Sequence, residues 1–140
     1  MKRLFYMLPF FLLFSCENNV DDKPTTSEND IDAARNFIRS ALDGDYSKAK
    51  DYMLQDSLNN QLLSTFEDNY RHRMSNADKR GYREASIRVP DVRKINDSVS
   101  VVIYSNSFKN KPDSLKVVKL TDKWVVDFKY SFPANDTTTK

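Results

Sequence analysis

Hydrophobic residues recur with a helical period in the first half of the chain. Spacings of three and four residues connect Ile31, Ala34, Phe37, Ile38, Ala41 and Leu42. This pattern predicts an amphipathic helix from about Asp30 to Gly44, since glycine suits the left-handed conformation that ends many helices. Asp45 is predicted to cap a short second helix, and a third is expected over residues 56–74. The polar residues 75–81 are expected to form a loop.

Beyond Gly81 the apolar residues alternate with polar ones, which is typical of β-strands. Residues 85–89 form the first predicted strand, which Pro90 ends or bulges because proline has no backbone donor. Further strands are expected at 99–104 and 115–120, separated by polar turns.

A final strand is predicted from Trp124 to Tyr130. Trp124, Val126, Phe128 and Tyr130 share one of its faces, so Asp127 on the other face is expected to meet solvent. Helices followed by four strands predict an α+β domain, in which the helices pack on one face of a mainly antiparallel four-stranded sheet.

A separate apolar run, residues 4–14, follows Lys2 and Arg3 at the start of the chain. It is shorter than the ~20 residues that span a bilayer, and its length matches the hydrophobic region of a secretory signal. It ends in Leu13-Phe14-Ser15-Cys16, which resembles a bacterial lipobox except that Phe14 replaces the usual small residue.

The lipobox resemblance implies a signal peptide at residues 1–15 and a diacylglycerol on the Cys16 thiol. The protein would then be anchored in the cell envelope of a Gram-negative bacterium, with the outer membrane expected and its periplasmic or surface face left open. The alternative is a plain cleaved signal beside an incidental cysteine. Residues 16–29 are predicted to be an acidic, flexible tether, 30–132 a single domain and 133–140 a disordered tail.

Composition excludes several functions. The chain has 22 basic and 20 acidic residues, and loss of Lys2 and Arg3 with the signal balances them, so nucleic-acid binding is not indicated. Cys16 is the only cysteine, so a lipid there leaves no thiol for a disulfide, a metal or a nucleophile. With two glycines no glycine-rich phosphate loop can form. We expect neither a metal nor a cofactor.

Two segments carry a family resemblance. "AARNFIRSALDGDYSKAKDYM", residues 33–53, and "KLTDKWVVDF", residues 119–128, resemble the opening helix pair and closing hairpin of small bacterial lipoproteins in the nuclear-transport-factor-2-like, or cystatin-like, superfamily. The resemblance implies a curved sheet wrapped around helices as a cone, often with a pocket inside. The lipoproteins most similar in pattern have no known function, while other branches are ketosteroid isomerase-like or SnoaL-like enzymes.

Two functions therefore remain open: a non-catalytic domain that binds a ligand or partner, and a small pocket enzyme. Tyr104, Trp124 and Tyr130 are the candidate pocket-lining residues. An isomerase-type enzyme needs a carboxylate base and a hydrogen-bond donor facing one pocket, and the predicted orientation of Asp127 disfavours it as that base.

Basic residues concentrate after the third predicted helix. The candidate site for an anionic glycan, lipid headgroup or envelope protein consists of Arg71, Arg73, Lys79, Arg80 and Arg83. A solvated helix face is the alternative reading of this run. His72, the single histidine, is expected to be exposed and is a poor metal ligand on its own.

Four Asp-Ser or Asp-Thr steps form a last pattern. They resemble acceptors of a general O-glycosylation system of some Gram-negative bacteria, with Ser57, Ser98, Ser114 and Thr137 as the candidate acceptors. The alternative is that these steps cap helices and open turns.

Overall fold

The computed structural model describes residues 26–133, so the predicted signal peptide, Cys16, Thr137 and nearly all of the tail lie outside the described residues. The elements follow in the order α1 (Asp30–Asp43), α2 (Tyr46–Asp51), α3 (Ser57–Asp68), the π-helical turn η1 (Asn69–Arg73), α4 (Asn76–Glu84), β1 (Ile87–Asn96), β2 (Val99–Asn106), β3 (Asp113–Lys119), β4 (Trp124–Asp127) and the 3₁₀ turn η2 (Phe128–Ser131). The predicted α+β arrangement, helices first and an antiparallel meander after them, is confirmed.

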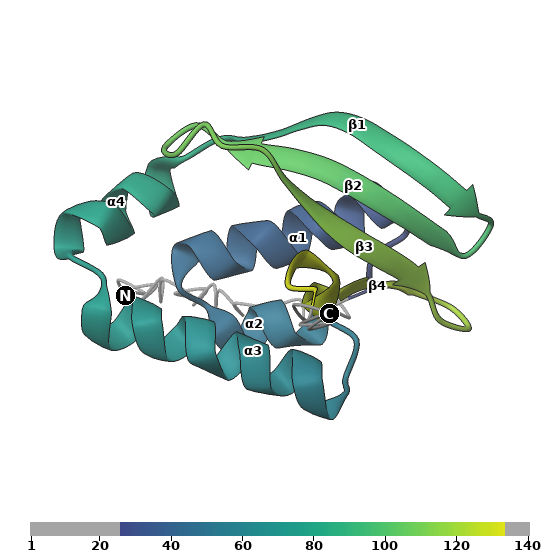
Figure 1. Ribbon diagram of the computed structural model, residues 1–140, viewed down its shortest axis with the longest axis horizontal. Helices are drawn as coiled ribbons and strands as arrows, with labels where there is room; N and C mark the ends of the chain where they lie inside the picture. The colour runs from purple at the N-terminus through teal and green to yellow at the C-terminus, as the bar shows by residue number, and fades with distance from the viewer. Residues whose placement is uncertain (1–25, 134–140) are drawn as a thin grey trace, which may run out of the picture.

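The four strands form one sheet in the order β1-β2-β3-β4. The sheet curves over α1, which contacts all four strands (Figure 1). The register of β1 against β2 shifts between Arg88 and Asp91, as expected where Pro90 cannot donate to the ladder. On the face toward α1, Val102 pairs with Leu115, and both are fully buried. They pack with the buried Phe37 of α1 in one hydrophobic core.

The helices begin and end where local chemistry favours it. The side chains of Asn29, Asp45 and Asp56 accept backbone N–H groups at the starts of α1, α2 and α3, which satisfies donors that a helix start leaves unpaired. Gly44 ends α1 with φ of 80°, a left-handed conformation that costs glycine little. The predicted roles of Gly44 and Asp45 are confirmed.

The segment after α2 extends the sheet. Met53 forms an isolated parallel bridge with Val126, flanked by hydrogen bonds from Leu54 N–H to the Val126 carbonyl and from Val126 N–H to the Tyr52 carbonyl, both 2.8 Å. This covers the outer edge of β4 and brings the start of α3 beside the end of that strand.

Several element boundaries differ from the sequence prediction. Strand β1 begins at Ile87 and continues past Pro90 to Asn96, so Pro90 coincides with a shift in register and does not end the strand. The expected loop at 75–81 lies largely within helix α4, whose cap Ser75 accepts the Asp78 N–H. The third helix changes at Asp68 into the π-helical turn η1. The last strand ends at Asp127, and Phe128 lies in η2, where its ring packs against Phe37 at 5.1 Å. Alternation had placed Phe128 inside the strand.

The last residues of the predicted tether pack against the domain. Ser27 is buried, and its carbonyl accepts the Trp124 N–H at 3.4 Å. Nearby, the buried carboxylate of Asp30 pairs with Lys94 of β1. These contacts fix the start of α1 to the sheet.

Candidate functional site

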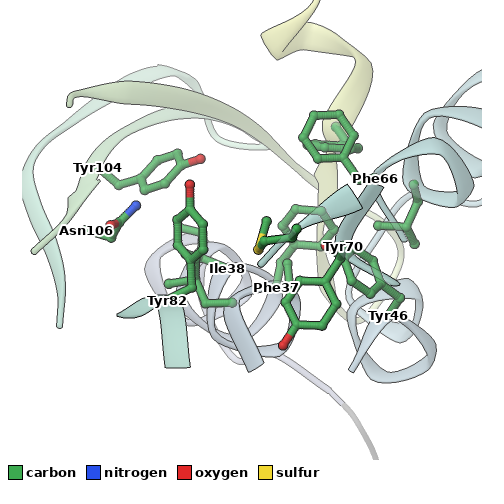
Figure 2. A pocket seen from close by; sticks show the side chains of 13 residues that line it. Phe37, Ile38, Tyr46, Phe66, Tyr70, Tyr82, Tyr104 and Asn106 are labelled. Carbon is green, nitrogen blue, oxygen red and sulfur yellow. The ribbon is translucent and has the colours of Figure 1, made fainter. Parts of the chain in front are cut away.

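A cavity of about 250 Å³ lies between the helices and the inner face of the sheet (Figure 2). Aromatic and aliphatic side chains dominate its wall. The lining residues are Phe37, Ile38, Ala41, Leu42, Tyr46, Leu63, Phe66, Tyr70, Met74, Tyr82, Tyr104, Asn106 and Phe128. Concave, mostly apolar sites with a few polar groups are typical of small-molecule binding.

The wall is assembled from elements far apart in sequence. The C-terminal half of α1 contributes Phe37, Ile38 and Ala41, which share a helix face because residues three and four apart lie together. Strand β2 contributes Tyr104 and Asn106. They lie on the same face as Val102, because every second residue of a strand points to the same side of the sheet. The helix and the end of the sheet thus define opposite walls.

Helix α4 supplies Tyr82 although every residue of this described helix lies at least partly exposed. Arg39 of α1 holds its C-terminal end by donating to the carbonyls of Ala85, Tyr82 and Arg83 at 2.7, 3.1 and 3.2 Å. A cation at this end also offsets the negative pole of the helix. Arg39 thereby fixes the part of α4 that bears the cavity-lining ring.

The same helix is packed closely against the β2–β3 loop. The Phe108 ring covers Gly81 so tightly that a Cβ there would lie 2.4 Å from its Cε2 atom. Phe108 also makes an edge contact with Tyr82, with ring centroids 5.0 Å apart. Gly81 therefore permits the close approach that positions Tyr82.

At the other end of the cavity, Tyr70 of η1 lies over Gly44. A Cβ on Gly44 would be 2.4 Å from Cε1 of the Tyr70 ring. Tyr70 also meets Tyr46 edge-on at 5.7 Å and carries the Lys79 ammonium 5.3 Å from its centroid. The ring closes this end because a side chain at position 44 is absent.

The cavity wall is uncharged. Its described lining contains no Asp, Glu, His, Lys or Arg. Burial raises the pKa of Tyr104, and nearby Asp113 raises it further. Burial, with weaker contributions from Tyr70 and Glu67, raises the pKa of Tyr46 to about 12. Both phenols are therefore neutral at physiological pH.

The three candidate pocket residues do not come together. Tyr104 lines the cavity, whereas Trp124 and Tyr130 lie outside its lining. Trp124 is half-buried at the start of β4, with the ammonium groups of Lys94 and Lys119 at 5.5 and 6.0 Å from its ring. Tyr130 is 45% exposed on η2.

The expectation that Asp127 faces solvent is wrong. Its side chain is buried and accepts hydrogen bonds from Lys129 at 2.5 Å and Asn59 at 3.1 Å, with Lys116 at 3.4 Å. Burial alone would raise the pKa of Asp127, but the hydrogen bonds and charges of these partners outweigh it and hold that pKa below its usual range.

Asn59 is central to this polar cluster. It is fully buried, donates to both Asp56 and Asp127, and accepts the Lys129 N–H at 2.7 Å. Lys129 also pairs with Asp56 at 2.7 Å. The cluster joins α3 to β4 outside the cavity lining. Its members saturate one another, so Asp127 is not available as a base in the cavity.

The predicted basic residues share one end of the molecule but form a mixed surface. Lys79 donates to the Arg71 carbonyl at 3.2 Å, which joins α4 to η1, while Arg71 pairs with Glu67 at 2.5 Å. Arg73, Arg80 and Arg83 are exposed and form no ion pair within residues 26–133. Acidic residues on the same segments, Glu67, Asp68, Asp78 and Glu84, reduce the positive potential.

The remaining candidates lie on the surface. Ser57 in the first turn of α3 and Ser98 in the β1–β2 turn are exposed, whereas Ser114 in β3 is half-buried. His72 is exposed as expected, with its Nε2 3.8 Å from Asp68. Across residues 26–133 there is no group of three His, Cys, Asp or Glu side chains that could hold a metal. Within that range, no helix is long and apolar enough to cross a bilayer.

Sequence reasoning missed Tyr82, Asn106, Tyr70 and Tyr46. The loop predicted for residues 75–81 ends one residue before Tyr82, so the sequence prediction contains no helix that brings this ring to the core. The sequence does contain a helix-start signature here, because Ser75 precedes Asp78 by three residues and good helix formers follow. Asn106 follows Tyr104 by two positions, so strand alternation extended by one step would have placed it on the cavity face.

Comparisons with known proteins give one structural likeness. No protein-family model and no curated protein matches the sequence. Among solved structures, the chain is similar to an NTF-2 like protein of unknown function from Shewanella oneidensis MR-1. The TM-score is 0.49 at 13% sequence identity, and the similarity covers 70% of this chain and 91% of that chain.

Proposed function

We propose that this protein is a lipid-anchored envelope protein whose domain binds a small apolar ligand without transforming it. The observation that carries the proposal is the cavity wall, which is dominated by apolar and aromatic side chains and contains no carboxylate, imidazole or cationic group among its described residues. Burial raises the pKa of its Tyr46 and Tyr104 phenols, so both are neutral at physiological pH. Such a wall favours a ligand through burial of apolar surface.

The enzymatic alternative has little support in this wall. General acid–base catalysis needs a group that exchanges a proton near the working pH and within reach of the substrate. Asp127 is the buried carboxylate that was considered as a base from the sequence. It accepts hydrogen bonds from Lys129 and Asn59 and lies outside the cavity lining. We therefore favour binding over catalysis.

The anchor is proposed from the sequence alone. A lipid on Cys16 would leave ten residues, 17–26, before the buried Ser27. A chain of that length spans at most about 35 Å when fully extended. The domain would thus stay close to the membrane, where apolar small molecules partition.

Native mass spectrometry of the full-length protein, extracted from its own envelope, tests the binding proposal. We expect a bound molecule of low mass, together with a mass increase on the mature chain from lipid on Cys16. Ala41→Phe puts a ring into the cavity and should lose the molecule. Ala77→Phe is the matched control, since Ala77 is exposed on α4 outside the lining.

Both variants should show the parent's circular dichroism before they are compared. Retention of the molecule by Ala41→Phe, or its equal loss from both variants, would contradict binding in this cavity. An unmodified Cys16 on the mature chain would contradict the anchor but not the binding proposal.

A further inference from the structure

One end of the cavity gathers its polar atoms. The Tyr82 hydroxyl points toward Tyr104, and the side-chain amide of Asn106 lies beside them (Figure 2). Tyr82 comes from α4 and the other two from β2. The opposite end is formed by Tyr70 and Tyr46, and the Tyr70 hydroxyl is directed at the Asp43 carbonyl, 3.5 Å away.

The polar side chains at this end keep some of their hydrogen-bonding groups free for a ligand. The Asn106 Oδ1 atom already accepts the N–H groups of Phe108 and Lys109 at 3.1 and 3.0 Å, which leaves the Nδ2 donor. The Tyr104 hydroxyl donates to Asp113 at 3.4 Å, which leaves its oxygen as an acceptor. The Tyr82 hydroxyl has no hydrogen-bond partner among residues 26–133. An amide donor, a phenol acceptor and a hydroxyl that can act as either are thus available.

The charges nearest this end are of both signs and lie outside the cavity lining. Asp113 accepts from the Tyr104 hydroxyl, and the Lys109 ammonium lies 5.8 Å from the centroid of the Tyr82 ring. No charged side chain lines the described cavity itself, so an ion inside it would have no partner in the wall. An uncompensated ion in such a site loses its hydration without an equivalent partner. The favoured ligand is therefore neutral.

The volume of the cavity limits the size of the ligand. A dry apolar cavity of ~150 Å³ is known to accept benzene, and the volume here is about 250 Å³. That is room for two fused rings inside the pocket. A hydroxyl group matches the polar end best, because it can accept from Asn106 Nδ2 and donate to a tyrosine oxygen at once.

We infer that the cavity binds a neutral, bicyclic-sized ring compound with its single hydroxyl group seated between Tyr82, Tyr104 and Asn106. This inference rests on the proposed binding function and specifies its ligand. The hydrocarbon part of the ligand contacts Phe37, Ile38 and the other rings of the wall, while the hydroxyl fixes its orientation.

Isothermal titration calorimetry with three probes of similar size tests it on the full chain: 2-naphthol, naphthalene and 2-naphthoate at pH 7. The parent should bind 2-naphthol several-fold more tightly than naphthalene and 2-naphthoate most weakly. Each neutral hydrogen bond contributes about 1 kcal/mol, or roughly fivefold in affinity.

Two variants isolate the polar end. Tyr82→Phe and Tyr104→Phe each remove only a hydroxyl and add no charge to the cavity. Each should weaken 2-naphthol binding roughly fivefold and leave naphthalene binding within about twofold of the parent. Tyr130→Phe, which removes an exposed hydroxyl outside the cavity, is the matched control and should change neither.

The outcomes are distinct. A naphthol preference that Tyr82→Phe and Tyr104→Phe both abolish supports the inference. No preference, an unchanged preference in both variants, or tighter binding of 2-naphthoate overturns it while the proposed function stands. Failure of the parent to bind any of the probes overturns this ligand class, and the native mass measurement then decides the proposed function separately.

Discussion

The two glycines of the chain provide a test of how the cavity is closed. Both lie under an aromatic ring, with a hypothetical Cβ 2.4 Å from Tyr70 at Gly44 and 2.4 Å from Phe108 at Gly81. They differ in backbone conformation, since Gly44 has φ of 80° and Gly81 lies within α4. The same substitution to alanine should therefore have very different costs.

For Gly44→Ala two penalties add. A left-handed conformation costs a residue with a Cβ about 1–2 kcal/mol, and forcing atoms into a packed site costs about 1–3 kcal/mol. Tyr70 cannot simply swing away, because Tyr46 and Lys79 pack against its ring. We expect the free energy of unfolding to fall by roughly 2–5 kcal/mol.

For Gly81→Ala a gain in helix propensity opposes the cost of displacing the Phe108 ring. Alanine is favoured over glycine in a helix by about 1 kcal/mol, while the Phe108 ring, 37% exposed, can rotate outward at a similar cost. The free energy of unfolding should stay within about 1 kcal/mol of the parent.

Urea unfolding followed by Trp124 fluorescence measures both variants. A loss in Gly44→Ala that is no greater than that in Gly81→Ala would refute the reasoning. The steric part has its own test, because Tyr70→Leu removes the ring that the new Cβ meets. The double variant Gly44→Ala with Tyr70→Leu should lose less than the two single losses together, and strict additivity would exclude the clash.

The other predictions concern the polar contacts around the cavity and the surface. Asp127→Asn should lower the free energy of unfolding by roughly 1.5–3 kcal/mol at pH 7, measured by urea, because Lys129 loses a charged partner; an unchanged value would show that the cluster adds no stability. Since the folded pKa of Asp127 lies below its ordinary 3.8, its contribution is present above that value and is lost as the pH falls through the folded pKa. Acidification below about pH 4 should therefore destabilise the parent more than Asp127→Asn, and parallel curves would contradict this. Arg39→Gln should speed amide hydrogen exchange in α4 while β2 and β3 keep their protection; Arg35→Gln, an exposed change on the same helix, should leave α4 as in the parent, and equal effects of the two would remove the role assigned to Arg39. Intact-mass measurement of envelope-derived protein should show hexose-sized additions that decrease in Ser98→Ala, and a mass without additions would exclude O-glycosylation.

The fold was predictable wherever an element buries an apolar face. Periodicity located α1, and Gly44 marked its end, because the same residues that form the pattern also form the core. Helix α4 was missed for the converse reason: its Lys, Arg and Glu residues bury nothing, so it leaves no hydrophobic period. Its stability depends on a local cap at Ser75 and on Arg39, which is more than forty residues away.

The error at Asp127 has a different origin. Strand parity correctly separated Asp127 from Val126, and the register pairs it with Lys116. Parity gives the face of a sheet, however, and does not reveal what covers that face. Here Asn59 covers it from 68 residues away, and such a long-range polar partner leaves no periodic signal in either segment.

The distribution of charge links these observations to function. Charged groups at the periphery connect elements: Asp127 and Lys129 join β4 to α3, Asp30 and Lys94 join α1 to β1, and Arg39 joins α1 to α4. The cavity they surround keeps only neutral polar atoms. A charged group could act on a substrate only after its ion pair was broken, which is costly for a buried pair. This domain can therefore bind a neutral molecule while its charged side chains stay in the ion pairs that join its helices and strands. The same separation explains why acid should affect stability before it affects the cavity wall, whose described lining contains no carboxylate or histidine.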